Sequence, residues 1–302
     1  MIRQNFNADW TVEKGDGNSR MNSFLGNTQT QTVHLPYDAM IHEARTPDTK
    51  NGAQTGFYPG GEYIFQKHFT APQAWQGKPV SLVFEGVYQT ALVYLNGWLL
   101  TRNVNGYAEF TVEAGPYLKY GADNLLKVIA DNSLEPNSRW YTGSGIYRPV
   151  RLLVGNKVYL PQDTVRITTR EAGEGFALLD VTAQVQSAST VTERVTLQQT
   201  ICREGTAVLT DRQNLLLQPG ESRTVSFRYC VDSPALWSPE NPNLYTSTMQ
   251  VLEGEEELDR EETSFGIRTL SIDAAHGVRI NGQTVKLRGA CIHHDNGILG
   301  AA

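Results

Sequence analysis

Two stretches of the sequence carry side chains whose types suit the binding of a polyhydroxylated ligand. In the first, Asp131 and Asn132 end the apolar run 124–130, and Trp140 follows in the same loop. A carboxylate and an amide can accept and donate hydrogen bonds to sugar hydroxyls, and an indole can stack on the apolar face of a sugar ring. A simpler interpretation stays open, in which Asp131-Asn132 forms a turn and Trp140-Tyr141 is an aromatic corner between two sheets.

The second stretch is His293-His294-Asp295, which follows an expected strand at 285–287. Polar side chains at the C-terminal end of a strand suit the active face of a barrel. Neighbouring residues on a strand point to opposite faces, so His293 and His294 are poorly placed to share a metal ion. We therefore expect no metal site in this chain, and a plain polar loop remains the alternative.

Several other chemistries have no motif in this sequence. A dinucleotide-binding glycine fingerprint, a phosphate-binding loop, a nucleophile elbow and a paired-histidine zinc motif are all missing. The three cysteines are Cys202, Cys230 and Cys291, and no two of them are separated by two residues. A zinc knuckle or a disulfide framework is therefore not expected, and we expect no cofactor in this chain.

The elements that must position these side chains are expected to be strands. Apolar and polar residues alternate over 177–186 and 224–231, which is typical of strands with one buried and one wet face. Asn96-Gly97 and Asn281-Gly282 separate apolar runs and favour tight hairpins. No helical periodicity extends beyond about twelve residues. The sequence therefore predicts an all-β protein built from sandwiches.

The pattern changes twice along the chain. Gly155-Asn156 interrupts the strand set, which puts a first boundary between 156 and 157. Residues 157–268 have the length and strand pattern of one immunoglobulin-like β-sandwich. After 268 a hairpin is expected, and its second strand leads toward His293. The sequence therefore divides into 1–156, 157–268 and 269–302.

Length and composition narrow the class of protein further. The chain has 302 residues and a net charge of −6, which disfavours nucleic acid as a partner. Hydrophobic residues make up 40% of the chain and charged residues 19%, which disfavours disorder. No apolar run has the length of a membrane span, and no signal-peptide core is visible at the start. We expect a cytoplasmic protein that binds no membrane.

The motifs, taken in order, resemble glycoside hydrolase family 2, the β-galactosidase and β-glucuronidase group. The resemblance extends over essentially the whole chain. The motifs that carry it are Gly60-Gly61-Glu62-Tyr63, Phe84-Glu85-Gly86-Val87, Val93-Tyr94-Leu95-Asn96-Gly97, Gly145-Ile146-Tyr147-Arg148, Trp237-Ser238-Pro239, Ser264-Phe265-Gly266-Ile267-Arg268, Leu287-Arg288-Gly289 and His293-His294-Asp295.

The resemblance implies an N-terminal sugar-binding jelly roll over 1–156 and the immunoglobulin-like sandwich over 157–268. It implies that 269–302 is a hairpin and the first strand of a truncated (β/α)₈ barrel. The family consists of retaining glycosidases, which need two carboxyl groups about 5–5.5 Å apart. Both catalytic glutamates of the family lie later in the barrel. The resemblance therefore implies no catalytic residue in this chain and predicts that the 302-residue chain is inactive.

The resemblance also suggests roles for individual residues in the parent enzyme. Asp131 matches an aspartate that the β-galactosidase branch extends into the sugar subsite, and His293 matches a first-strand histidine that contacts the sugar. Further substrate-binding candidates are Asn132, Trp140, His294 and Asp295. The expected ligand is a terminal β-galactoside or a related oligosaccharide. For the parent enzyme, magnesium or sodium ions and a homo-oligomer are expected.

Two alternatives remain open at this point. The same family also cleaves β-glucuronides and β-mannosides, and the residues that separate these substrates are expected in the barrel. The chain could instead be a stand-alone carbohydrate-binding module that binds glycans through Trp140 and Tyr141.

Overall fold

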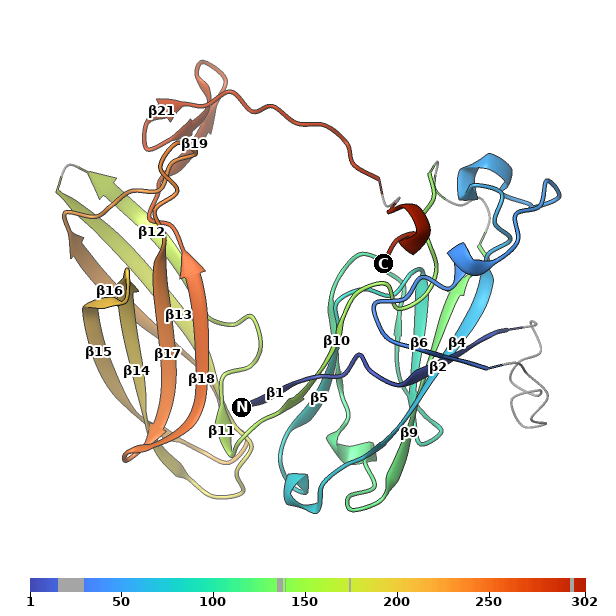
Figure 1. Cartoon of the computed structure of the whole chain (residues 1–302). Coiled ribbons are helices and arrows are strands. Elements are labelled where there is room, and N and C mark those ends of the chain that lie inside the picture. Colours follow the sequence, from blue (N-terminus) through green and yellow to red (C-terminus); the bar gives the residue numbers. More distant parts are fainter. Residues whose placement is uncertain (16–29, 135–137, 139, 174, 294–295) are drawn as a thin grey trace. The chain divides into compact units, whose positions relative to one another are not determined.

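The computed structural model describes residues 1–15, 30–134, 138, 140–173, 175–293 and 296–302. The chain divides into two compact units. The first sandwich unit consists of Ile2–Val154 and Cys291–Ala302, and the second consists of Met1 and Gly155–Ala290. In the described part of the chain the regular elements are strands and short 3-10 turns, so the protein is all-β (Figure 1).

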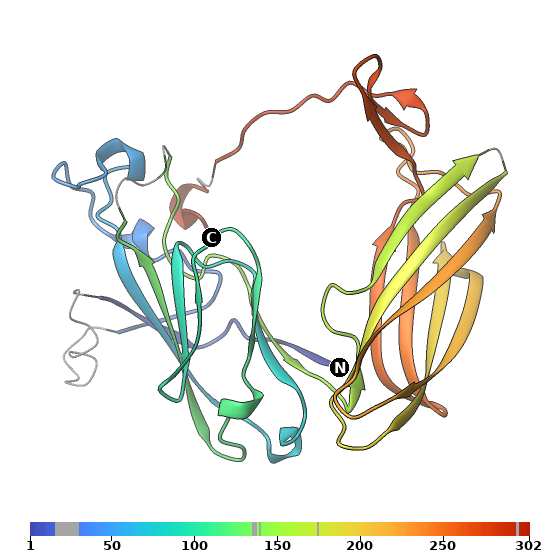
Figure 2. The same cartoon turned by 180° about the vertical axis from the view of Figure 1, so that it is seen from behind.

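The first sandwich unit consists of a four-stranded and a six-stranded sheet, and every strand pair is antiparallel. The smaller sheet has the order β1 (Ile2–Asn5), β10 (Val150–Val154), β5 (Val80–Phe84) and β8 (Phe110–Glu113). The larger sheet has the order β3 (Gln31–Val33), β2 (Trp10–Lys14), β4 (Gly61–Thr70), β9 (Asp123–Asn132), β6 (Thr90–Leu95) and β7 (Trp98–Asn103). Figure 2 shows both sheets from behind.

The expected alternation explains which side chains of these strands are buried. In β9 the side chains of Leu126, Val128 and Ala130 are fully buried, as their spacing of two residues predicts. The hairpin between β6 and β7 turns at Asn96-Gly97, where both residues have positive φ (52° and 90°). This is the backbone geometry that an Asn-Gly pair tolerates well.

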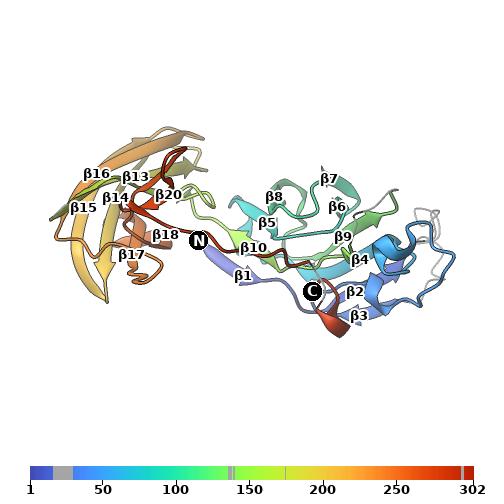
Figure 3. The same ribbon diagram turned by 90° about the horizontal axis from the view of Figure 1, so that it is seen from above.

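The described part of this unit also contains short 3-10 turns. They are η1 (Met40–His42), η2 (Gly52–Thr55), η3 (Gln73–Trp75), η4 (Gly115–Tyr117) and η5 (Gly297–Leu299). Turn η5 belongs to the segment 296–302, which lies at the end of the sandwich where β9 ends and β4 begins (Figures 1 and 3).

The second sandwich unit also has two antiparallel sheets. One sheet contains β11 (Val158–Tyr159), β13 (Phe176–Ser187) and β12 (Arg166–Gly173), and β16 (Ser222–Asp232) pairs with β13. The other has the order β15 (Thr206–Leu217), β14 (Glu193–Arg203), β17 (Tyr245–Glu253) and β18 (Glu256–Phe265). Buried and half-buried residues alternate along the whole of β13, so the predicted strand with one buried face is confirmed.

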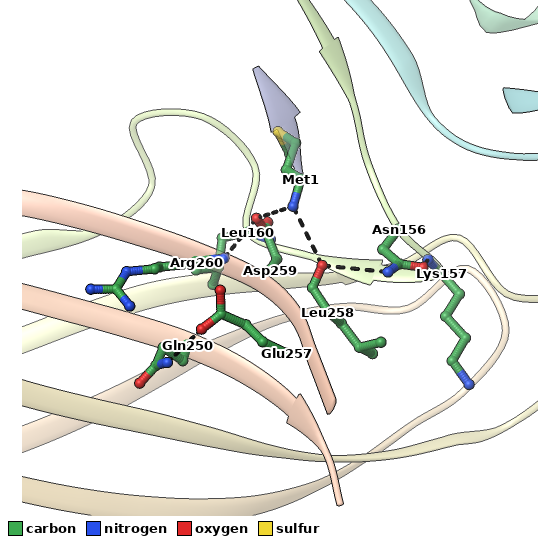
Figure 4. Close-up of polar contacts among 9 residues, drawn as sticks. All are labelled: Met1, Asn156, Lys157, Leu160, Gln250, Glu257, Leu258, Asp259 and Arg260. Atoms are coloured by element: carbon green, nitrogen blue, oxygen red, sulfur yellow. Dashed lines mark hydrogen bonds and ion pairs between the residues drawn. The ribbon is translucent and has the colours of Figure 1, made fainter. Parts of the chain in front are cut away.

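A buried carboxylate lies where β18 passes β11 in the second unit (Figure 4). Asp259 is 1% exposed. Its Oδ2 accepts the Leu160 backbone N–H at 2.8 Å, and its Oδ1 lies 2.7 Å from the amino nitrogen of Met1. Burial of a charged group is costly unless it is paired and hydrogen-bonded, and both requirements are met here.

The stretch 269–302, expected as one piece, is divided between the two units. A small sheet of β19 (Leu270–Asp273), β20 (Gly277–Ile280) and β21 (Gln283–Thr284) belongs to the second unit. Its hairpin turns at Asn281-Gly282, where both residues have positive φ, as predicted. Residues 291–302 belong to the first unit, because Ala301 hydrogen-bonds to Asp38 there.

The strand expected at 285–287 is not formed. Strand β21 ends at Thr284, and the described residues 285–293 contain no strand. The Val285 N–H still donates to the Val278 carbonyl at 2.9 Å, so the hairpin extends by one bond. Beyond that bond no described strand pairs with this segment, and Leu287 is 76% exposed. The alternation of Val285 and Leu287 therefore did not suffice to predict a strand.

Candidate functional site

Asp131 lies at the end of β9, in the middle of the six-stranded sheet. Its neighbours in the ladder are Glu62 on β4 and Thr90 on β6. The carboxylate Oδ1 accepts the Ser133 backbone N–H at 2.9 Å and the Ser133 hydroxyl at 2.6 Å. These bonds form the local turn that the simpler interpretation describes. Among the described residues, Asp131 makes no hydrogen bond or ion pair with Trp140 or His293.

Asn132 is buried directly beside Asp131, with 2% of its surface exposed. Its Nδ2 donates to the Gly143 carbonyl at 3.1 Å. The amide therefore joins the end of β9 to the loop that carries Trp140 and Tyr141. In this position Asn132 orders the loop from inside the sandwich.

Trp140 and His293 come from the two separate stretches of the sequence and lie against each other. Their ring centroids are 4.4 Å apart and the rings are stacked at 30°. The indole also donates a hydrogen bond to the Tyr107 hydroxyl, and Tyr107 meets the Tyr88 ring edge-on at 5.3 Å. Trp140 is 38% exposed and His293 is exposed. The pair thus offers an aromatic surface with hydrogen-bonding edges, while His294 and Asp295 lie outside the described residues.

A buried carboxylate, Asp38, holds the elements around this surface together. Its Oδ1 accepts the backbone N–H groups of Met40 at 3.1 Å and Ser144 at 2.9 Å. Its Oδ2 accepts the Tyr141 hydroxyl at 2.5 Å and the Ala301 backbone N–H at 2.9 Å. Asp38 is only 1% exposed, so these four donors replace the water that a carboxylate would otherwise bind.

Sequence reasoning missed Asp38. The residue follows Pro36-Tyr37 in an irregular segment, where no periodicity marks a side chain as buried. The structure explains why the loop that faces it contains glycine, although the glycine alone does not identify Asp38. Gly143 has φ +69°, and a Cβ atom there would lie 2.6 Å from Asp38 Oδ2 and 2.5 Å from the Ala301 Cβ. Only glycine fits this close approach.

A second tyrosine and carboxylate pair joins strand β4 to Glu43, which follows turn η1. The Tyr63 hydroxyl of β4 donates to Glu43 Oε1 at 2.5 Å, and Lys14 Nζ lies 2.5 Å from Glu43 Oε2. Burial, together with the adjacent carboxylate, raises the pKa of Tyr63 far above its ordinary value of 10.0. Burial and Asp38 raise the pKa of Tyr141 in the same way. Both phenols therefore stay protonated and act as donors to their carboxylates.

A cavity of about 670 Å³ lies on the other side of Tyr141 in the first unit. The Arg45 guanidinium lies 5.0 Å above the Tyr58 ring, and Tyr58 meets Tyr141 edge-on at 5.6 Å. The full lining consists of Ile41, His42, Arg45, Gly56, Tyr58, Tyr141, Gly297, Ile298 and Leu299. Segment 296–302 therefore contributes to two features, the cavity wall and the contact with Asp38.

The described residues do not supply a metal site. In the part of the chain that the structure describes, no three side chains of His, Cys, Asp or Glu are gathered so that they could hold an ion. A search of the same residues finds no helix with the length and apolar character that a membrane crossing requires.

Two family models match this chain, and together they cover most of it. The "Glycosyl hydrolase 2 galactose-binding domain-like" model matches residues 10–173, and the "Glycosyl hydrolases family 2" model matches residues 158–268. The first match corresponds to the sandwich that carries Asp131 and Trp140. The second match corresponds to the immunoglobulin-like sandwich.

Known proteins with these domains are considerably longer. A β-galactosidase of Bacteroides ovatus is 35% identical over 301 residues, which are 99% of this chain and 35% of that protein. A β-glucuronidase of Formosa agariphila is 26% identical over 312 residues, which cover 94% of this chain and 31% of that protein. The crystal structure of a family 2 member from Bacteroides cellulosilyticus has a TM-score of 0.90 at 32% identity and covers 100% of this chain and 40% of that chain. This chain, which spans about a third of the curated relatives it matches, belongs to glycosyl hydrolase family 2.

Proposed function

We propose that this chain is the N-terminal, non-catalytic part of a retaining glycosidase that cleaves terminal β-galactosides. In this proposal the first sandwich unit supplies side chains that bind the sugar, and a (β/α)₈ barrel supplies the chemistry. The stack of Trp140 on His293 carries the proposal, because it joins a jelly-roll loop to the segment that would begin the barrel. The similarity to the β-galactosidase of B. ovatus over 99% of this chain supports the choice of substrate.

Each proposed side chain has a distinct role in binding. Asp131 accepts hydrogen bonds from sugar hydroxyls at the end of β9. The Trp140 ring packs against an apolar ring face, and the imidazole edge of His293 donates or accepts at a hydroxyl. His294 and Asp295 belong to the same polar segment and are proposed as further contacts.

The cleavage itself is assigned to residues outside this chain. A retaining glycosidase uses one carboxyl group as acid and base and a second as nucleophile, on opposite sides of the scissile bond. Binding groups alone cannot form the glycosyl-enzyme intermediate. We therefore propose that the 302-residue chain does not turn over β-galactosides. Metal ions of the parent enzyme, magnesium or sodium, would require ligands beyond the described residues.

The proposal is tested by hydrolysis of nitrophenyl β-galactoside. The chain extended through its natural downstream sequence is compared with the 302-residue chain, and nitrophenyl β-glucuronide and β-mannoside are assayed in parallel. We expect cleavage of the galactoside by the extended chain only. Turnover by the 302-residue chain would contradict the proposal that both catalytic carboxyl groups lie outside it.

Other outcomes point to the two alternatives. Preference of the extended chain for the glucuronide would move the protein to the β-glucuronidases, a group that the similarity to the F. agariphila protein also admits. A third outcome is that no glycoside is cleaved, that the 302-residue chain binds a glycan, and that Trp140→Ala abolishes this binding. In that case the protein is a carbohydrate-binding module.

A further inference from the structure

Segment 296–302 is held in the first sandwich unit by few contacts, and most of its own side chains are exposed. Ile298 is 87% and Leu299 is 54% exposed, so apolar burial contributes little to its position. The Ala301 backbone N–H, in contrast, donates to the buried Asp38 Oδ2 at 2.9 Å. Gly300 approaches the same oxygen so closely that a Cβ atom there would clash with it. A buried carboxylate is therefore the principal anchor of this segment.

Only one of the two oxygens of Asp38 bonds to segment 296–302. Oδ1 binds the backbone of Met40 and Ser144, which are both jelly-roll residues. Oδ2 binds the Tyr141 hydroxyl and the Ala301 N–H. Tyr141 is the direct neighbour of Trp140 in the chain. One carboxylate oxygen thus holds both the loop that carries Trp140 and the segment that follows His293.

We propose that Asp38 is the positioning residue for the Trp140 and His293 stack and therefore for the sugar subsite. The proposal rests on the function proposed above for its catalytic consequence, but its structural part stands on the contacts alone. Asp38 is buried, so it acts through the two segments that it joins and has no direct contact with the sugar. Without Oδ2, segment 296–302 loses its anchor and His293 is no longer held against the indole.

The substitution Asp38→Asn distinguishes the role of Oδ1 from that of Oδ2. An asparagine amide oxygen can keep the bonds to Met40 and Ser144 in place of Oδ1. Its NH₂ group would then face the Ala301 N–H, and two donors cannot form a hydrogen bond. Tyr141→Phe removes the phenol bond to the same oxygen. Tyr63→Phe is its control, because that phenol also donates to a carboxylate, but to the half-buried Glu43.

A pair of glycine variants tests the same contact from the other side. Gly300 and Gly297 both have positive φ, +62° and +56°. A Cβ at Gly300 meets Asp38, whereas a Cβ at Gly297 meets nothing within 4 Å. Both substitutions place an alanine at positive φ, and Gly297→Ala controls for that effect. Gly300 also has ψ −119°, so Gly300→Ala adds backbone strain to its clash with Asp38, and only this variant pushes the segment away from the carboxylate.

The first measurement is the NMR spectrum of the histidine ring protons in the 302-residue chain. A ring stacked on an indole is shifted by the ring current, and His293→Gln identifies the resonance. We expect Asp38→Asn, Tyr141→Phe and Gly300→Ala to move the His293 resonance toward that of a free histidine. We expect Tyr63→Phe and Gly297→Ala to leave it in place. An unchanged His293 resonance in folded Asp38→Asn and Gly300→Ala, or an equal shift in both controls, would overturn the proposal.

The second measurement is steady-state hydrolysis by the extended chain. Asp38→Asn and Gly300→Ala should raise KM for the galactoside by about tenfold with less change in kcat, because the lost contacts bind substrate and transition state alike. Tyr63→Phe and Gly297→Ala should match the parent. If the His293 resonance moves as expected but no glycoside is cleaved, Asp38 still positions the stack and the proposed function is wrong. If cleavage is normal in Asp38→Asn although the resonance has moved, the catalytic part of the proposal fails.

Discussion

The side-chain amide of Asn124 joins the loops that precede β9 and follow β6 in the first sandwich unit. Asn124 at the start of β9 is fully buried. Its Oδ1 accepts the Asn96 side-chain amide and the Lys119 backbone N–H, both at 2.8 Å. Its Nδ2 donates to the carbonyls of Lys119 at 2.9 Å and Ala122 at 3.0 Å. All four bonds are made inside the protein, so each side-chain atom has a fixed role as donor or acceptor.

We expect Asn124→Asp to destabilise this unit. The new carboxylate oxygen would face two carbonyl oxygens that now accept from Nδ2, and it would be buried as a charge without a partner. The loss should be about 2–4 kcal/mol, since an unsatisfied charged group exceeds the 1–3 kcal/mol of a neutral one. Urea unfolding followed by fluorescence measures it.

Asn105→Asp is the control for that substitution. In the hydrogen bonds of the Asn105 side chain, Oδ1 is the acceptor, and the donors are the backbone N–H groups of Tyr107 and Ala108. An aspartate can accept both bonds, so the stability should change by less than about 0.5 kcal/mol. Equal losses in the two variants would show that charge alone, and not the lost donor, sets the effect.

Candidate site residues could be singled out from the sequence only where local chemistry marks them. Trp140 and His293 stand out as an aromatic and a titratable side chain in loops, and the structure brings them into contact. Asp38 could not be found, because its partners Tyr141, Ser144 and Ala301 lie 103, 106 and 263 positions away in the sequence. No periodicity connects residues at such separations. Only the tertiary structure shows that they share one carboxylate.

At the scale of elements, one lysine joins the ends of three strands in the second unit. Lys157 precedes β11, and its Nζ lies 3.0 Å from Glu193 at the start of β14 and 2.7 Å from Glu253 at the end of β17. The bonds to Glu253 and Glu193 raise the pKa of Lys157 above 10.5. The bond to Lys157 lowers the pKa of Glu193 below 4.5.

The direction of both shifts defines the pH window of this cluster. A lowered carboxylate pKa stabilises the folded state above about pH 4.5, and this contribution is lost as the pH falls through the folded pKa. A raised lysine pKa stabilises the folded state below about pH 10.5, and this contribution is lost as the pH rises through the folded pKa. The cluster therefore contributes fully between these limits.

Lys157→Met should lower stability at pH 7 by about 1 kcal/mol, a modest value because the lysine side chain is 37% exposed. The difference from the parent should shrink when the unfolding free energy is measured toward pH 3. The double variant with Glu193→Gln should lose less than the single variant, since no carboxylate is left unpaired at the start of β14. A difference that is the same at pH 7 and pH 3 would argue that the lost lysine packing, and not its charge, matters.

Most strands could be predicted because burial on one face imposes a period of two. In β16 the residues Val225, Phe227, Tyr229 and Val231 are all buried, and the residues between them are exposed. The same pattern was too short to be decisive at 285–287, where the described chain has no strand to pair with. A strand forms only where a neighbouring strand is available for hydrogen bonding, and the local alternation of apolar residues does not show whether there is one.

At the scale of the whole molecule, the buried apolar residues form two separate cores. Leu82 is fully buried in one of them and Leu197 in the other, and the two sets share no residue. Each core has its own pair of sheets. This arrangement is typical of domains that unfold as separate cooperative units.

We expect calorimetry to resolve two unfolding transitions. Leu82→Ala should destabilise one of them, and Leu197→Ala the other, each by about 2–5 kcal/mol. Each variant serves as the control for the other, because the chemical change is the same. A single transition that both variants lower equally would mean that the two cores unfold together.

The contact between Asp38 and Ala301 also has a consequence for the time course of synthesis. The two residues are 263 positions apart, and the whole of Gly155–Ala290 lies between the two parts of the first unit. At about 5–20 residues per second, a ribosome needs roughly 7–27 s to add those intervening residues. Strands β1 to β10 are therefore complete long before their last hydrogen-bonding partner exists. During that interval Asp38 Oδ2 can accept the Tyr141 hydroxyl but not yet the Ala301 N–H, and segment 296–302 gains its anchor only after the second sandwich has been made.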